Sequence, residues 1–222
     1  MTFILNILHK DHVIVAADKK GVAEWPDIWG LKDTERVETN DVKKIVLNST
    51  EEMAIGISGY SPHNSFENAF RGAKSSEEAL SIVRKHMEGF LQVDDLPALI
   101  KNASPFENKS IASFYDLGSQ TFFSNEFYFN EYSNGTRLHR ASEQVKLFCA
   151  GSGKVYFDLD NEQKNLQSLI ESIAATDLSE VFMQWVIARF ETVSGKDNGC
   201  GSEVLFAVSS RKSPKFQLID SC

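Results

Sequence analysis

Residues 13–20, Val13-Ile14-Val15-Ala16-Ala17-Asp18-Lys19-Lys20, form an apolar run that ends in a carboxylate and two lysines. Short runs of β-branched and small apolar residues are typical of strands. A second apolar run, from Phe3 to Leu8, precedes it, and the polar segment 10–12 separates the two. We therefore expect a β-hairpin whose second strand ends at Asp18.

After this hairpin, short apolar runs alternate along the chain with segments whose apolar residues recur at helical spacing. Two more strands are expected before any helix, then two helices, a second block of strands, two further helices and a last strand pair. The expected strands are Lys44–Leu47, Met53–Ser58, Ser110–Tyr115, Gln120–Phe129, Thr136–His139, Gln144–Ala150, Val204–Val208 and Lys215–Ile219. The residues that mark helical faces are Phe66 and Phe70; Leu80, Val83, Met87 and Phe90; Leu166, Leu169, Ile170 and Ile173; and Leu178, Val181, Phe182, Trp185 and Val186.

This order is explained by two antiparallel sheets that pack face to face, with helices on their outer faces. Periodicity thus predicts an α+β sandwich, and residues 1–222 fit a single domain in length. Gly21 to Asn40 is rich in turn formers and charge and is predicted to be an extended loop, and Asn134-Gly135 is predicted to be a turn. Trp25 and Trp29 either form a local apolar core or contact substrate or another subunit, and we favour contact.

Composition excludes several classes of function. A net charge of −8 opposes binding to nucleic acid. No apolar run approaches the roughly 20 residues of a membrane-spanning helix, and the first residues lack the features of a secretory signal, so we expect a cytoplasmic protein without membrane attachment. The three cysteines have no paired spacing, and neither they nor the five histidines have metal-ligand spacing. Free thiols, no metal and no cofactor are expected.

Thr2 follows Met1, and a residue this small is one behind which an initiator methionine is normally removed. Removal would leave a free α-amine on a threonine. A hydroxyl is a weak nucleophile unless a nearby base takes its proton, and an α-amine with a pKa of about 7.7–8.0 can do so near neutral pH. Because threonine after methionine is common, an ordinary residue at the start of a strand is the alternative interpretation.

Further segments stand in a fixed order after Thr2, and Asp18 follows it by 16 positions. They are Val13–Asp18, Asp41-Val42-Lys43-Lys44-Ile45, Ala54-Ile55-Gly56-Ile57-Ser58-Gly59, Ala150-Gly151-Ser152-Gly153 and Asp197-Asn198-Gly199-Cys200-Gly201. In this order they resemble the motifs of proteasome β subunits and HslV-type peptidases, a family of N-terminal-nucleophile threonine hydrolases. Within that family the chain resembles a bacterial proteasome homologue. The resemblance covers nearly the whole chain and implies that family's four-layer αββα sandwich.

The resemblance implies a role for each matched residue. Thr2 would be the nucleophile, with Lys44 beside it, held there by Asp18, and Lys43 facing outward. The backbone N–H of Gly59 would form the oxyanion hole. Ser152 and Asp197 would orient the α-amine and a relay water. Cys200 stands where the family has a serine, and a thiol is a weaker hydrogen-bond donor than a hydroxyl.

The function implied is that of a threonine peptidase that hydrolyses peptide bonds in peptides or unfolded proteins. The resemblance also implies a homo-oligomeric ring and an ATPase unfoldase as partner. Two alternatives stay open. One is a catalytically silent structural ring subunit, which retention of Met1 would favour, and the other is an amidohydrolase of the same class that acts on small amides.

Overall fold

The computed structural model describes residues 2–24, 36–39, 42–58, 63–91, 108–129, 134–173 and 178–221. Within them the chain is mixed α/β, with two five-stranded antiparallel sheets, a two-stranded ribbon and helices. The strands of the first sheet are, in spatial order, β10 (Lys146–Gly151), β1 (Phe3–Leu8), β2 (His12–Asp18), β11 (Val204–Ser210) and β12 (Ser213–Asp220). Those of the second are β5 (Ile45–Leu47), β6 (Met53–Ser58), β7 (Asn108–Asp116), β8 (Thr121–Phe129) and β9 (Asn134–Arg140).

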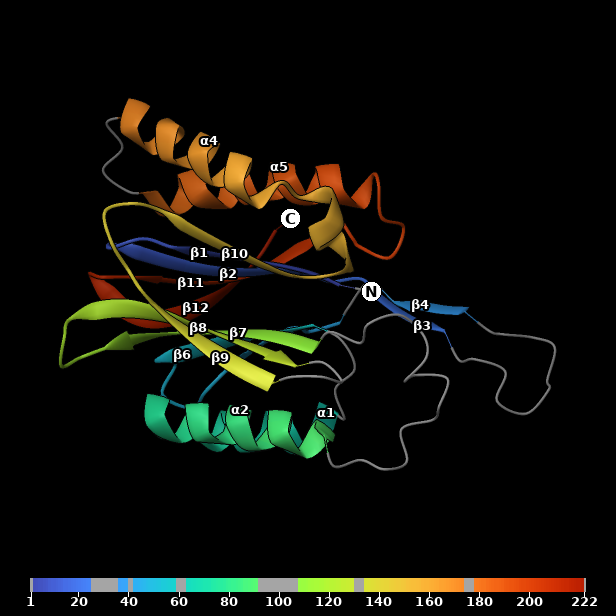
Figure 1. Ribbon diagram of the computed structural model, residues 1–222, viewed down its shortest axis with the longest axis vertical. Helices are drawn as coiled ribbons and strands as arrows, with labels where there is room; N and C mark the ends of the chain where they lie inside the picture. The colour runs from blue at the N-terminus through green and yellow to red at the C-terminus, as the bar shows by residue number, and fades with distance from the viewer. Residues whose placement is uncertain are drawn as a thin grey trace.

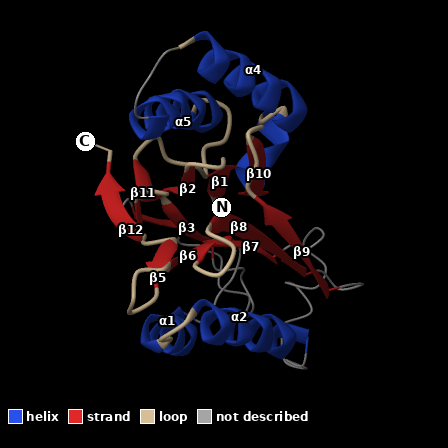
Figure 2. Cartoon of the chain, turned by 90° about the vertical axis from the view of Figure 1, so that its left-hand side faces the viewer, coloured by secondary structure: helices blue, strands red, loops and turns tan. Residues whose placement is uncertain are grey.

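Helices flank the two sheets on opposite sides (Figure 1). The first sheet is covered by α4 (Leu159–Ser172) and α5 (Leu178–Ser194), and the second by α1 (His63–Gly72) and α2 (Ser76–Leu91). A 3₁₀ turn, η1 (Ser152–Tyr156), links β10 to α4. Figure 2, turned by 90°, shows the same sequence of helices, sheet, sheet and helices. No helix in the described part of the chain has both the length and the apolarity needed to cross a membrane.

Strand β1 is buried on both of its faces because successive side chains of a strand point to opposite sides. Phe3, Leu5 and Ile7 belong to the apolar cluster shared with α4 and α5. Ile4 and Leu8 belong to a second cluster, which contains residues of both sheets. The first hairpin therefore lies at the centre of the packing and not at its surface, as the near-continuous apolar run predicts for a strand covered twice.

The second sheet packs on its helices through a third apolar cluster, in which Phe70 of α1 and Val83 of α2 contact strand residues such as Ile55. Helix α2 has a capped start. The Ser75 hydroxyl accepts the Glu78 N–H at 3.1 Å, so one of the free N–H groups at this end is paired. The Glu78 carboxylate accepts the Lys74 N–H at 2.8 Å and holds the preceding segment against the first turn.

The predicted strands and helices of the described residues are confirmed, and so is the mixed fold with two antiparallel sheets. Two local predictions were wrong. The segment 21–40 is not an extended loop throughout, because β3 (Gly21–Glu24) pairs with β4 (Arg36–Thr39). Asn134 and Gly135 do not form a turn, because they continue β9 and pair with β8. In both places the register with a partner strand outweighed local turn propensity.

A small polar cluster joins the two sheets inside the otherwise apolar core. Asn6 of β1 is fully buried, and its amide Nδ2 donates to the Ser113 hydroxyl at 2.8 Å and to the Ile14 carbonyl at 3.1 Å. Its Oδ1 accepts the Ser124 hydroxyl at 2.9 Å, and the two serine hydroxyls lie 2.9 Å apart. Because each buried polar group has partners, the cluster fixes the position of one sheet against the other without a large desolvation cost.

Replacing Asn6 by leucine should therefore destabilise the protein by about 1–3 kcal/mol, because Ser113 and Ser124 lose partners in a dry core. The triple variant N6L/S113A/S124A removes every member of the cluster and should be more stable than N6L alone. Urea unfolding of the three proteins measures both differences. Additive losses, with the triple variant the least stable, would contradict the role assigned to the cluster.

Candidate active site

The carboxylate of Asp18, at the end of β2, is the centre of the candidate site. It is completely buried, and both of its oxygens accept hydrogen bonds. Oδ1 accepts the Phe3 N–H at 2.7 Å, and Oδ2 accepts the Lys44 ammonium at 2.8 Å and the Gly201 N–H at 3.1 Å. Three segments that are far apart in the sequence thus meet at one side chain, and the first of them begins beside Thr2.

Lys44 lies one residue before β5 and points inward, with 6% of its side chain exposed. Besides Asp18, its ammonium donates to the backbone carbonyl of Lys20. Burial lowers the pKa of Lys44, and the adjacent Asp18 carboxylate opposes that shift. Lys43, the neighbouring residue, is exposed. The sheet therefore presents the second lysine of the pair to the site and the first to solvent.

A second group of polar side chains lies at the other side of Thr2. The Thr2 nitrogen donates to the Ser152 hydroxyl at 3.4 Å, and that hydroxyl donates to Oδ2 of Asp197 at 2.9 Å. The Cys200 thiol donates to the same carboxylate oxygen at 3.3 Å and lies 3.8 Å from the Ser152 hydroxyl. The Gly199 N–H completes the set by donating to Oδ1 at 2.9 Å.

Two pKa values in this group have clear physical causes. Burial would raise the pKa of Asp197, but hydrogen bonds from Gly199, Ser152 and Cys200 outweigh it and hold that pKa below its usual value. Burial, assisted by the nearby carboxylates of Asp18 and Asp197, raises the pKa of the Cys200 thiol to about 12. At neutral pH the group therefore consists of an ionised carboxylate and a protonated thiol that donates to it.

The turn after β10 approaches Thr2 so closely that it requires glycine. Gly151 has a φ of +90°, and a Cβ there would overlap the Thr2 carbonyl oxygen. A Cβ at Gly153 would lie 2.8 Å from Cβ of Phe3, and the Gly153 N–H donates to the Thr2 carbonyl at 3.4 Å. The Gly-Ser-Gly sequence thus brings the Ser152 hydroxyl up to the Thr2 nitrogen.

The structure brings together most of the residues singled out in the sequence: Thr2, Asp18, Lys44, Ser152, Asp197 and Cys200. Gly59, the expected oxyanion donor, lies outside the described residues, as do Met1, Trp25 and Trp29. Within the described residues no group of three or more potential metal ligands is found.

Sequence reasoning missed the part played by Lys20. Its backbone carbonyl holds the Lys44 ammonium, and its own ammonium donates to the Asn198 carbonyl at 2.7 Å, in the turn that carries Asp197 and Cys200. A residue that acts through its main chain has no sequence motif. The position of Lys20, two residues after Asp18, was the one available signal that it lies near the site. A polar hollow of about 240 Å³, lined by residues that include Lys20, Cys200 and Gly201, opens beside this turn.

The Asp18–Lys44 pair generates a prediction about stability. Replacing Asp18 by asparagine keeps the size of the side chain but leaves the Lys44 ammonium buried without its carboxylate, which should cost about 3–5 kcal/mol. Asp220 is the matched control, because it pairs with Lys19 at 3.3 Å but is 60% exposed, so D220N should cost less than about 1 kcal/mol. Urea unfolding at pH 7.5 measures both, and equal losses in the two variants would contradict the assignment.

No protein-family model matches the chain, and no curated protein matches it. The motif resemblance and the geometry around Asp18 and Thr2 are therefore the two independent grounds on which a function can be proposed.

Proposed function

We propose that this chain is a threonine peptidase of the N-terminal-nucleophile hydrolase class, with the four-layer αββα fold of that class and with Thr2 exposed by removal of Met1. The observation that carries the proposal is the Asp18 carboxylate, which accepts both the N–H of Phe3, the residue after Thr2, and the buried Lys44 ammonium. The succession of helices, sheet, sheet and helices supports the fold assignment (Figures 1 and 2).

The hydrogen bond between Thr2 and Ser152 suits an amine that acts as a base. Once Met1 is gone, the Thr2 nitrogen becomes the α-amine. Since the Ser152 hydroxyl donates to Asp197, its lone pairs are available to accept an N–H from that amine. The nitrogen lone pair is then free to take the proton of the Thr2 hydroxyl, so the residue carries its own general base.

The Lys44 ammonium shares the Asp18 carboxylate with the N–H of Phe3, the residue after Thr2, and would supply positive potential to the nucleophile. Asp18 fixes its position, and the Lys20 carbonyl restricts it further. As the Thr2 oxygen loses its proton and attacks an amide carbonyl, negative charge develops on the reacting atoms, and a cation held in a fixed position stabilises that charge. The amine then protonates the departing nitrogen of the substrate, leaving an ester on Thr2 that water hydrolyses.

The wider proposal follows the resemblance of the sequence motifs. The chain would act in the cytoplasm on peptides or unfolded proteins, as a homo-oligomeric ring served by an ATPase unfoldase. Gly59 remains the proposed oxyanion donor. Cys200 would assist Asp197 as a protonated donor and not as a second nucleophile, because its thiolate is scarce at neutral pH.

The first test compares Met-trimmed protein with its Thr2→Ala and Thr2→Ser variants in a peptide-hydrolysis assay. T2A should lose activity by about 10³-fold or more, since it lacks the nucleophile, whereas T2S keeps both hydroxyl and amine and should retain measurable activity. Circular dichroism should show all three folded. Equal rates for wild type and T2A would end the catalytic assignment, and intact mass establishes whether Met1 has been removed.

The second test uses a peptide epoxyketone, which forms a ring adduct with both the hydroxyl and the free amine of an N-terminal threonine. The wild-type protein should gain the mass of one inhibitor on the peptide that begins at Thr2, and T2A should gain none. A Met-trimmed protein that forms no adduct and hydrolyses no peptide would favour the silent structural subunit. Hydrolysis of small amides without hydrolysis of peptides would favour the amidohydrolase.

A further inference from the structure

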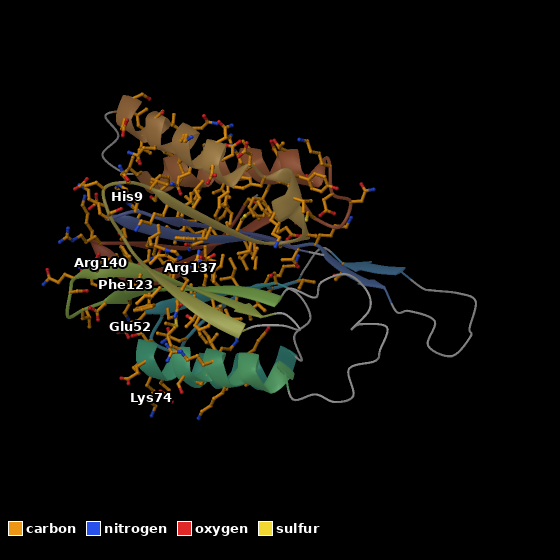
Figure 3. The ribbon with its side chains drawn as sticks, in the orientation of Figure 1. His9, Glu52, Lys74, Phe123, Arg137 and Arg140 are labelled. Carbon is orange, nitrogen blue, oxygen red and sulfur yellow. The ribbon has the colours of Figure 1, made fainter. Side chains whose placement is uncertain are left out.

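Two histidines flank the turn between β1 and β2, at the end of β1 that lies away from Thr2. The turn is closed by the bonds from His9 N–H to the His12 carbonyl at 2.9 Å and from His12 N–H to the His9 carbonyl at 3.3 Å. Figure 3 labels His9 at the end of the first sheet opposite the N-terminus marked in Figure 1. These histidines play no part in the proposed function.

Both imidazole rings lie against the same side chain of α5. The Phe182 ring is fully buried, and its centroid lies 6.0 Å from that of His9 and 6.1 Å from that of His12, each in an edge-on arrangement. The turn thus contacts the first part of α5 through two titratable aromatic rings. A contact of this kind depends on the charge of the rings, because a charged imidazole is costly to keep beside buried apolar surface.

His9 is held in the neutral form by its surroundings. Only 4% of the residue is exposed, and its Nδ1 accepts the Asp11 N–H at 3.4 Å. A ring nitrogen that accepts a hydrogen bond carries no proton, so protonation at Nδ1 would break this bond and place a cation in the core. Burial lowers the pKa of His9 from its ordinary value of 6.5.

The charged groups around His9 act in opposite directions on its pKa, and burial has the largest effect. Asp11 and Glu143 favour its protonated form, whereas His12 and Lys10 disfavour it. Lys10 is itself engaged by the Glu143 carboxylate at 2.7 Å, which weakens the ability of that carboxylate to stabilise a second cation. From the β11–β12 turn, Arg211 donates its N–H to the Asp11 carbonyl at 2.8 Å and brings a further positive charge near this end of the sheet. Burial therefore decides the outcome for His9.

We propose that His9, with His12 beside it, is a pH-sensitive clamp between the β1–β2 turn and α5, which loosens when its imidazole takes up a proton below neutral pH. The clamp joins two elements that lead to the candidate site. Strand β1 begins at Phe3, next to Thr2, and α5 ends at Ser194, shortly before Asp197. Loosening at the turn would act on both halves of that site, whatever reaction the site performs.

The direction of the effect follows from the lowered pKa. At pH 7.5, about one unit above the ordinary value of 6.5, His9 is essentially neutral in both the folded and the unfolded chains, so it contributes almost no pH dependence there. As the pH falls below 6.5, the unfolded chain takes up a proton that the folded chain resists, and stability is lost until the pKa of the folded state is reached. At pH 5.5 this one residue can raise the ratio of unfolded to folded protein by up to about tenfold.

The test compares the pH dependence of urea unfolding in wild type, His9→Asn and His139→Gln. The side-chain oxygen of asparagine can replace Nδ1 as acceptor of the Asp11 N–H but does not titrate. His139 is the control histidine, because it is partly buried and lies in β9 of the second sheet, whereas His9 follows β1 of the first. Between pH 7.5 and 5.5, H139Q should still lose stability, because it leaves His9 in place. The unfolded-to-folded ratio of H9N should rise several-fold less than that of wild type.

The clamp would be overturned if the stability of H9N fell with pH as much as that of wild type. It would also be overturned if H139Q lost this pH dependence and H9N kept it. Should H9N not fold at pH 7.5, the imidazole resonances of the wild-type protein, followed by NMR as the pH is lowered, test the same point. A titration midpoint for His9 below 6.5, with Nδ1 unprotonated at pH 7.5, is expected. A midpoint at or above 6.5 would overturn the proposal.

Discussion

The buried carboxylate of Asp18 is the constraint on which both the packing and the candidate site depend. An ionised carboxylate without partners would be too costly in the interior, so the fold supplies an ammonium and two backbone N–H groups. Each partner comes from a different segment, at the start of β1, before β5 and before β11. Satisfying one charge therefore fixes the relative positions of three segments around Thr2. Asp18 and Lys44 are both buried, so their charges interact more strongly with each other than they would at the surface.

Much of the fold could be predicted from the sequence because local pattern and tertiary packing agree there. The apolar runs of the first hairpin and the helical periods of α4 and α5 specify strands and helices without knowledge of their partners. The β3–β4 ribbon could not be predicted in this way, since each of its strands has only four residues and its partner lies across a long connection. The continuation of β9 through Asn134 and Gly135 likewise depends on β8.

In the candidate site, too, some groups could be predicted from the sequence and others could not. Asp18 can be predicted from the sequence because a carboxylate ends an apolar strand. The choice of Lys44 over Lys43 rests on motif resemblance, since both are lysines at the edge of a strand. The contributions of the Phe3 and Gly201 N–H groups and of the Lys20 carbonyl could not be predicted, because a backbone group has no signature in the sequence. Only the folded chain shows which main-chain atoms face a buried charge.

Cys200 illustrates how surroundings decide the chemistry of a residue type. A cysteine near a lysine could be expected to be a reactive thiolate. Here burial and two carboxylates keep the proton on sulfur, and the thiol donates to Asp197 beside the Ser152 hydroxyl. Two donors on one carboxylate oxygen leave Asp197 ionised and its position fixed, so the weaker donor strength of sulfur is offset by the stronger bond from Ser152. In the proposed reaction the thiol therefore leaves the nucleophilic role to the Thr2 hydroxyl, whose own nitrogen would take its proton.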